Sequence, residues 1–304
     1  MSNTFVERFC HKIFQKNPKK SKDEIIKKLT HLYLNGRKLE EIGELTCEQL
    51  KVLYLHNNSI QKIANLDQLH HLTHLYLQWN RIRKIENINH LQNLRKLYLS
   101  YNEIECLDGV DNLNLLEELH LEYQNLQSQH EFTFGVNSLI GISASLRILN
   151  ISGLRLNELK LLKTLPHLEE LSAADNNFDN GDYIARSIEH LGYLTKAIFT
   201  NCPAQMNDIY YRNKVILASK SLEILDSRMV NDVTRSFLKS FDKVKTEHKQ
   251  KLANTNNNAK IVDIDLREDL PSIHSEGRTF DVTNIISQAI VENMQNEPWA
   301  LIQD

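Results

Sequence analysis

The sequence lacks a long apolar run, and its cysteines are few and scattered. No stretch of about 18 or more apolar residues is present, so we expect no membrane-spanning helix and no membrane partner. The first ten residues do not show the basic-then-apolar order of a secretory signal. The 4 cysteines include no CxxC pair, which predicts free thiols in a reducing, cytoplasmic compartment. They are Cys10, Cys47, Cys106 and Cys202.

The motifs of common enzymes are also absent. The chain has only 9 glycines, and it contains no G-x-S-x-G, Walker or G-x-G-x-x-G motif. The densest histidine group, His70, His71 and His74, would need a fourth ligand and rigid geometry to hold zinc. Adjacent carboxylates such as Glu117 and Glu118 are expected to be solvated surface groups. We therefore expect no enzyme, no cofactor and no metal.

An excess of positive charge is missing as well. The 36 basic and 39 acidic side chains give a formal net charge of −3. Proteins that coat nucleic acid usually carry a basic excess that releases counterions from the phosphates. We therefore expect no nucleic-acid partner.

What the sequence does contain is a repeated leucine pattern, L-x-x-L-x-L-x-x-N-x-L. One copy is Leu72, Leu75, Leu77, Asn80 and Ile82. A spacing of about 22 residues between copies lies within the range of leucine-rich repeats, and a series in register is strong evidence for them. The copies begin at Leu29, Leu50, Leu72, Leu94, Leu116, Leu146, Leu168 and Leu194.

The spacing predicts the fold. L-x-L has a period of two, so each copy forms a short strand with its leucines on one side. One repeat cannot bury that side alone, and neighbouring repeats therefore stack around a shared core. We predict an α/β leucine-rich-repeat solenoid, a horseshoe of about eight repeats with a parallel concave sheet, a helical N-cap and a C-terminal cap.

Two irregularities interrupt the series. The interval from Leu116 to Leu146 exceeds one repeat, and we place the extra length near 127–141 as a loop or a longer helix. The asparagine side chain of the pattern normally forms hydrogen bonds with backbone groups of the turn. Four copies have another residue there, so their turns should be looser or differently bonded. These residues are Arg37, Gln124, Leu154 and Cys202.

The ends of the stack need covering. Ser21 and Glu24 have the spacing of a capping box before a short helix. Residues 201–226 resemble the C-terminal cap of intracellular leucine-rich-repeat proteins. Five apolar residues then follow at helical spacing, and packing on the cap is favoured over a dedicated partner helix. They are Val230, Val233, Phe237, Phe241 and Val244. The expected divisions are 1–23 (lead), 24–226 (repeats and cap), 227–250 (amphipathic helix) and 251–304 (disordered tail).

Aromatic residues line the predicted concave face. One column contains Tyr54, Tyr76, Tyr98 and His120. Because strands stack about 4.8 Å apart, the rings should form a continuous strip. Such rings are typical of interface hot spots, although stacked tyrosines also stabilise a sheet. A second, less generic column contains Trp79, Tyr101 and Tyr123.

Charges on this face are expected to orient a partner. Basic residues such as Arg95 precede the aromatic columns, and acidic residues follow them. A face polarised in this way raises the association rate of a complementary partner. The acidic residues placed in the binding site are Glu118, Glu122 and Asp175.

Four segments carry a family resemblance, which covers roughly residues 24–245. The chain resembles the leucine-rich-repeat regulatory subunits of type 1 protein phosphatase. The resemblance implies binding of the type 1 phosphatase catalytic subunit through the concave face, at centrosomes, microtubules or ciliary bases. The segments are 72–78 (LTHLYLQ), 85–87 (IEN), 119–126 (LHLEYQNL) and 219–226 (SKSLEILD).

Two other functions remain open. The horseshoe could serve as a structural cytoskeletal or ciliary scaffold that binds tubulin or dynein components. It could also be a splicing-type subunit that holds an RNA-binding partner, because such subunits end in a similar cap. The near-neutral charge allows this last function only through a protein partner.

Overall fold

The computed structural model describes residues 4–16, 19–126, 131–244, 246 and 250. The chain divides into two compact units, and the first, Met1–Thr246, holds nearly all of these residues. The expected tail, 251–304, lies outside the described residues.

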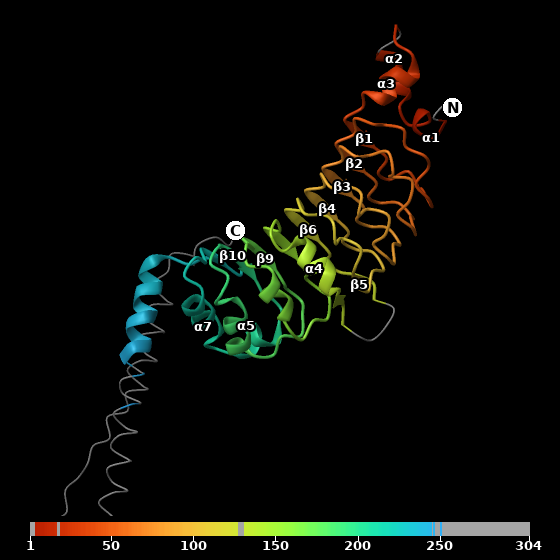
Figure 1. Ribbon diagram of the computed structural model, residues 1–304. Coiled ribbons are helices and arrows are strands. Elements are labelled where there is room, and N and C mark those ends of the chain that lie inside the picture. The colour runs from red at the N-terminus through yellow and green to blue at the C-terminus, as the bar shows by residue number, and fades with distance from the viewer. Residues whose placement is uncertain (1–3, 17–18, 127–130, 245, 247–249, 251–304) are drawn as a thin grey trace, which may run out of the picture. The chain divides into compact units, whose positions relative to one another are not determined.

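The first unit is built on one sheet of short, stacked strands (Figure 1). Its order is β1-β2-β3-β4-β6-β8-β9-β10-β11-β12, and every pairing is parallel except that of β11 with β12. The predicted α/β leucine-rich-repeat solenoid with a parallel sheet is therefore confirmed. The strands are β1 (His31–Tyr33), β2 (Val52–Tyr54), β3 (His74–Tyr76), β4 (Lys96–Tyr98), β6 (Glu118–His120), β8 (Ile148–Asn150), β9 (Glu170–Ser172), β10 (Lys196–Ile198), β11 (Ile224–Leu225) and β12 (Arg228–Met229).

The strands from β1 to β10 in this sheet are three residues long because the L-x-L segment is, whereas β11 and β12 have two residues each. The middle residue, such as Leu75 of β3, is fully buried, and the residues on either side are half-buried on the other face of the sheet. The registered pairing Leu53–Leu75–Leu97 repeats this arrangement from strand to strand. One continuous apolar core results, as stacking of single repeats requires.

A ladder of buried amides joins the turns. The Asn102 Oδ1 accepts from the N–H of Ile82 at 3.0 Å, and its Nδ2 donates to the carbonyls of Leu77 (3.1 Å) and Leu99 (2.8 Å). Asn58, Asn80 and Asn176 bond in the same way.

Gln124 corrects one expectation. Its turn is not looser, because Oε1 accepts from Ile104 N–H at 3.0 Å and Nε2 donates to the carbonyls of Leu99 and Leu121. The longer glutamine side chain therefore makes the same three hydrogen bonds that asparagine makes in the other turns. At Cys202 the bonding does differ, since a thiol donates to the Ala173 carbonyl at 3.5 Å.

The long fifth interval contains added secondary structure. Strand β7 (Thr133–Phe134) pairs with β5 (Cys106–Leu107) in a separate two-stranded sheet. Helix α4 (Val136–Ile142) follows and buries Leu139 and Ile142. Part of the expected insertion, 127–130, lies outside the described residues.

The N-terminal helices cover the first repeat, and the core extends further toward the N-terminus than expected. Ser21 Oγ accepts from the N–H of Glu24 at 3.2 Å and caps α3, as the sequence predicted. Val6 and Cys10 of the expected lead are also buried in the core. The helices are α1 (Thr4–Glu7), α2 (His11–Lys16) and α3 (Lys22–Lys27).

The C-terminal cap closes the other end of the sheet. Tyr211 is buried, Arg212 Nη1 donates to the Leu225 carbonyl at 2.9 Å, and Asp226 Oδ1 accepts from Phe199 N–H at 2.7 Å. These contacts join the last full strand to the cap. The helices between β8 and β11 are η1 (Lys160–Thr164) and α5 (Gly181–Ile188), which lie in the repeats, and α6 (Pro203–Asn207) and α7 (Tyr211–Ala218), which lie in the cap.

A further helix follows the cap at residues 232–244. The sequence favoured packing of its apolar residues on the cap. Of the five residues singled out, only Val230 packs against the core, while Val233, Phe237, Phe241 and Val244 are exposed. Leu238, which that series did not include, is the buried one because it lies on the side of the helix that faces the cap.

Candidate protein-binding face

The outward residues of the strands form an aromatic stack, here called the tyrosine ladder. Its members are the third residues of β1, β2, β3, β4 and β6, brought into line by the pairing register. Ring centroids lie 4.7, 4.7, 4.6 and 4.5 Å apart, and adjacent planes differ by no more than 19°. The spacing is that of the strands themselves. The ladder is Tyr33, Tyr54, Tyr76, Tyr98 and His120.

A second stack, the tryptophan ladder, consists of Trp79, Tyr101 and Tyr123. The Trp79 and Tyr101 centroids are 3.8 Å apart, and those of Tyr101 and Tyr123 are 5.2 Å apart. Trp79 is exposed to solvent over 51% of its surface. Large rings on a surface are the usual anchors of protein interfaces.

The backbone at the tryptophan ladder is unusual for aromatic residues. Trp79, Tyr101 and Tyr123 have φ angles of 59°, 55° and 54°, the left-handed region in which a bulky side chain is disfavoured. Other repeats place residues better suited to this conformation at the same position, among them Gly36, Asn57, Gly153 and Asn201. Strained residues of this kind are concentrated at functional sites.

The tryptophan ladder ends in a hydrogen bond across a gap. Tyr123 Oη donates to Asp175 Oδ2 at 2.6 Å, and Asn201 Nδ2 donates to the other carboxylate oxygen at 3.0 Å. The ring of Tyr123 reaches over Gly153, where a Cβ atom would lie 2.4 Å from it. The hydrogen bond to Asp175 raises the pKa of Tyr123 to about 12.

Glu118 bonds to the last two members of the tyrosine ladder, Tyr98 and His120, and is not a solvated surface group. It is buried, with 8% exposed. Its Oε1 accepts from Tyr98 Oη at 2.5 Å and contacts His120 Nε2 at 2.9 Å, while Oε2 pairs with Lys96 Nζ at 2.5 Å. The expectation of a solvated carboxylate is wrong here because the neighbouring strand β4 supplies two polar partners, Lys96 and Tyr98, and His120 of its own strand supplies a third.

His120 lies between two carboxylates. Its Nε2 faces Glu118, and its Nδ1 lies 3.6 Å from Glu122 Oε2. Burial lowers the pKa of this imidazole, but Glu122 and Glu118 outweigh burial and raise the pKa overall. Burial likewise raises the pKa of Glu118, and hydrogen bonds from Lys96, Tyr98 and His120 reverse the shift and lower it.

The expected charge polarity is largely cancelled by pairing. Arg95 Nη1 pairs with Glu117, directly before β6, and Lys96 pairs with Glu118 of β6. In the acidic half, Arg147 pairs with Glu169 at 3.3 Å and Lys196 with Glu170 at 3.0 Å. The alternation of sign from strand to strand neutralises most of the face, so we assign it no strong steering field.

The two ladders lie side by side with a polar column between them. This column has one residue per repeat, directly before the tryptophan ladder in sequence: His56, Gln78, Ser100 and Glu122. The His56 Nδ1 and Gln78 Oε1 atoms are covered and have no hydrogen-bond partner among the described residues. Sequence reasoning placed Glu122 in the binding site but missed His56, Gln78 and Ser100, although their constant offset from the repeat leucines was a usable signal.

The structure therefore brings most of the predicted site residues together. Both ladders, with Glu118, Glu122 and Asp175, form one continuous surface, here called the strand face. Arg95 lies at its edge and is paired with Glu117. The three histidines considered as metal ligands do not form a site, and no metal-binding group of three or more such side chains occurs among the described residues.

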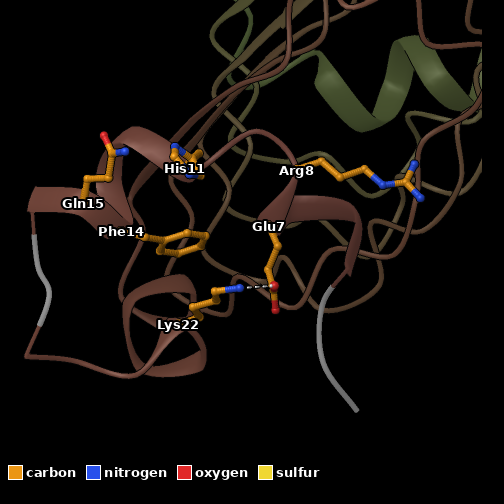
Figure 2. Close-up of a pocket in the computed structure, with 6 residues that line it drawn as sticks. All are labelled: Glu7, Arg8, His11, Phe14, Gln15 and Lys22. Carbon is orange, nitrogen blue, oxygen red and sulfur yellow. Dashed lines mark hydrogen bonds and ion pairs between the residues drawn. The ribbon is translucent and has the colours of Figure 1, made fainter.

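A separate pocket of about 640 Å³ lies between the N-terminal helices (Figure 2). Lys22 Nζ pairs with Glu7 at 2.9 Å and lies 5.7 Å from the Phe14 ring centroid. Lys22 is the only lysine among the residues that line the pocket, and it is already paired with residues of the same pocket. We therefore place no candidate site there. The lining residues are Glu7, Arg8, His11, Phe14, Gln15 and Lys22.

Two further observations concern chemistry and membranes. The 4 cysteines are free thiols, and three of them are buried. Within the part of the chain that the structure describes, no helix has the length and apolar character needed to cross a bilayer.

Comparisons with known proteins agree with this architecture. Residues 48–92 match the family described as Leucine Rich repeats (2 copies). The fold is similar to that of an internalin from Listeria monocytogenes str. 4b F2365, with a TM-score of 0.53 and 20% identity over 73% of this chain and 74% of that chain. It is also similar to a leucine-rich-repeat protein of Leptospira interrogans, with a TM-score of 0.50 and 23% identity over 64% of this chain and 47% of that chain. These likenesses show the leucine-rich-repeat fold.

Proposed function

We propose that this leucine-rich-repeat protein is a non-catalytic module that binds another protein through its strand face. Leucine-rich-repeat domains are generally protein-interaction scaffolds, and the match over residues 48–92 places two repeats of the strand face in that family. The observation that carries the proposal is the tryptophan ladder. Trp79, Tyr101 and Tyr123 retain a disfavoured backbone conformation where Asn57 and Gly153 occupy the same position in other repeats.

The partner that we propose is the catalytic subunit of type 1 protein phosphatase. This assignment rests on the resemblance of segments such as 72–78 and 219–226 to the leucine-rich-repeat regulatory subunits of that enzyme. It carries with it a location at centrosomes, microtubules or ciliary bases in the cytoplasm.

A binding assay with the purified full chain and the phosphatase catalytic subunit tests both the proposed partner and the proposed contact through the strand face. The variant is Trp79→Asn/Tyr101→Asn, because Asn57 shows that asparagine fits this backbone conformation. The matched control is Tyr193→Ala, an exposed aromatic residue outside both ladders. We expect the double variant to weaken binding at least about 10-fold, and the control to bind like the wild type.

The outcomes separate the two parts of the proposal. Binding that survives in the double variant would keep the phosphatase as partner and move the contact away from the tryptophan ladder. No binding by the wild-type chain would remove the phosphatase. A cytoskeletal scaffold on tubulin or dynein would then be the leading account, and microtubule co-sedimentation of the same variants would test it.

A further inference from the structure

Two carboxylates of the strand face, those of Glu122 and Asp175, pair with no lysine or arginine of the described chain. Glu122 has only the His120 imidazole, whose Nδ1 lies 3.6 Å from Oε2. Asp175 accepts hydrogen bonds from the uncharged groups of Tyr123 at 2.6 Å and Asn201 at 3.0 Å. The other carboxylates at the strands of the fifth and seventh repeats each have a basic partner: Glu117, Glu118, Glu169 and Glu170. A basic partner can therefore still pair with Glu122 and Asp175.

Tyr123 joins these two carboxylates. It follows Glu122 in the chain, and its Oη reaches Asp175 across the sixth repeat. Its ring stacks on that of Tyr101 with centroids 5.2 Å apart, yet 39% of Tyr123 stays exposed. The hydrogen bond to Asp175, burial, and then the charges of Asp175 and Glu122 raise the pKa of this phenol. An exposed aromatic ring beside unpaired carboxylates attracts a cation.

The polar column beside Tyr123 contains acceptors that lack donors. Glu122 Oε2 and Gln78 Oε1 are covered and have no hydrogen-bond partner among the described residues. Ser100 lies between them in the column and is only 4% exposed, and its hydroxyl likewise bonds to no described residue. Covered acceptors without donors cost free energy, and the end groups of glutamate and glutamine turn readily. The column is therefore suited to a partner that brings N–H groups.

The surface next to Tyr123 carries short side chains. Along the register of the sheet, the large rings of the tyrosine ladder end at His120, and small residues follow in the sixth and seventh repeats. A long side chain of a partner would therefore meet these small residues and the side of the Tyr123 ring. They are Asn150 and Ser172 in the register of the tyrosine ladder, Ser152 and Ala174 in that of the polar column, and Gly153 next to the Tyr123 ring.

Arginine fits this arrangement better than lysine. A guanidinium is planar and weakly hydrated, so it can lie against an aromatic ring while its fork of N–H groups reaches more than one acceptor. Glu122 and the Ser100 hydroxyl belong to adjacent repeats, so one fork can reach both. A lysine ammonium is a compact, strongly hydrated point charge and gains less from a flat ring.

We infer that the strand face receives an arginine side chain of the bound protein beside Tyr123. The guanidinium lies against the Tyr123 ring and pairs with Glu122, and the charge of Asp175 strengthens the attraction. The inference rests on the proposed function, because it takes the strand face as a protein-binding surface. It adds the chemistry of the contact, since the partner must present a basic segment that contains arginine.

The test measures binding of N-acetyl-arginine amide to the full chain by NMR. The ring signal of Tyr123 is followed after its assignment with Tyr123→Phe. N-acetyl-citrulline amide has nearly the same shape without the charge, and N-acetyl-lysine amide has the charge without the planar fork. We expect the arginine compound to shift the Tyr123 signal with a Kd on the order of millimolar. The lysine compound should bind at least about 3-fold more weakly, and the citrulline compound at least about 10-fold more weakly.

Matched variants locate the site. Glu122→Gln keeps the shape of the side chain and should weaken binding of the arginine compound at least about 5-fold, and Glu122→Gln/Asp175→Asn should abolish the saturable shift. Glu44→Gln/Asp67→Asn removes two negative charges from exposed positions in the segments after β1 and β2, and it should leave the affinity unchanged. Circular dichroism checks that each variant folds.

Several results would overturn the inference. Equal affinity for the arginine and citrulline compounds would contradict recognition of charge, and equal affinity for the arginine and lysine compounds would contradict the choice of arginine. An equal loss in the Glu44/Asp67 control would mean that binding follows net charge alone. Undiminished affinity in the Glu122/Asp175 variant would place the contact elsewhere, and the absence of any saturable shift would remove the site.

This test is independent of the one for the proposed function. A chain that binds the arginine compound at Tyr123 but not the phosphatase would keep the arginine site and lose the proposed partner. A chain that binds the phosphatase through the tryptophan ladder but not the arginine compound would keep the proposed function and overturn the inference.

Discussion

Tyr123 donates a 2.6 Å hydrogen bond to Asp175 across the width of the repeat that contains Gly153. The two residues belong to the fifth and seventh repeats, and the sixth supplies only a glycine between them. The tryptophan ladder therefore does not stop at Gly153 but is bridged over it, which ties the aromatic part of the strand face to the acidic part.

Gly153→Ala is expected to destabilise the protein by about 2 to 3 kcal/mol. An added Cβ would lie 2.4 Å from the Tyr123 ring, and the residue has a φ of 66°. The left-handed backbone alone costs a side chain about 1 kcal/mol, and the overlap with the ring adds a similar or larger amount. Urea denaturation measures the change in free energy of unfolding.

Gly36→Ala is the matched control. Gly36 has a φ of 64°, but nothing lies within 4 Å of an added Cβ. Only the backbone cost of about 1 kcal/mol is expected there. Equal losses in the two variants would mean that Tyr123 does not occupy the space above Gly153.

Asn102→Ala should cost about 3 kcal/mol. The change removes the partners of the Ile82 N–H and of the Leu77 and Leu99 carbonyls, all within the core. Buried polar groups left without partners each cost about 1 to 3 kcal/mol, partly relieved by local relaxation. The measurement is again the urea midpoint.

Asn125→Ala controls for the loss of an asparagine from the same turn region, since Asn125 is exposed. We expect a change within about 0.5 kcal/mol. Gln124→Asn offers a second comparison, because Gln124 and Asn102 make equivalent bonds. A large loss for Asn125→Ala, or none for Asn102→Ala, would contradict the ladder of amides.

The fold followed from the sequence because its signal is periodic. Leu75 and Asn80 recur at fixed offsets, and a recurring offset fixes both the strand and the turn. The helix at residues 232–244 was harder to interpret. Helical spacing identified Phe237 and Phe241 as one face of that helix, but spacing does not reveal what the face packs against.

The candidate site was predictable in position but not in bonding. The ladder residues could be read from the repeat columns, since strand stacking brings equal positions together. Glu118 and its three partners could not. Whether a carboxylate is solvated depends on the lengths and directions of side chains on the neighbouring strand, here Lys96 and Tyr98 of β4. The left-handed backbone at Trp79 was also hidden, because an aromatic residue is an improbable choice for it.

The Glu118–His120 pair should make stability depend on pH. The pKa of His120 is raised above its ordinary value of 6.5, so its contribution is fully present below pH 6.5 and is lost as pH rises through the raised pKa. The pKa of Glu118 is lowered, so its contribution is present above its ordinary value of 4.5 and is lost as pH falls through the lowered pKa. Together they contribute most between about pH 4.5 and 6.5.

Comparison of His120→Gln with the wild type isolates the contribution of the Glu118–His120 pair to stability. The difference in free energy of unfolding between wild type and variant should be larger at pH 6 than at pH 8. The groups that face His120 are Lys96 and Tyr98 on β4 and Glu118 and Glu122 on its own chain segment, with Asn150 of β8 on the other side. A difference that is constant with pH would sink the assignment of charge to His120.

We expect the substitution Trp79→Asn to weaken partner binding while leaving the stability of the protein almost unchanged. Trp79→Asn loses the 3.8 Å stack on Tyr101, worth about 0.5 to 1.5 kcal/mol, but relieves a left-handed backbone that costs a similar amount. The two effects nearly cancel, so thermal and urea midpoints should change little. Trp79→Ala loses the stack and keeps more of the backbone cost, and it should be about 1 kcal/mol less stable than Trp79→Asn. If the tryptophan is present for stability alone, Trp79→Asn will unfold much more easily than the wild type. If it is present for a partner, Trp79→Asn will keep its stability and lose binding, which is the result we expect.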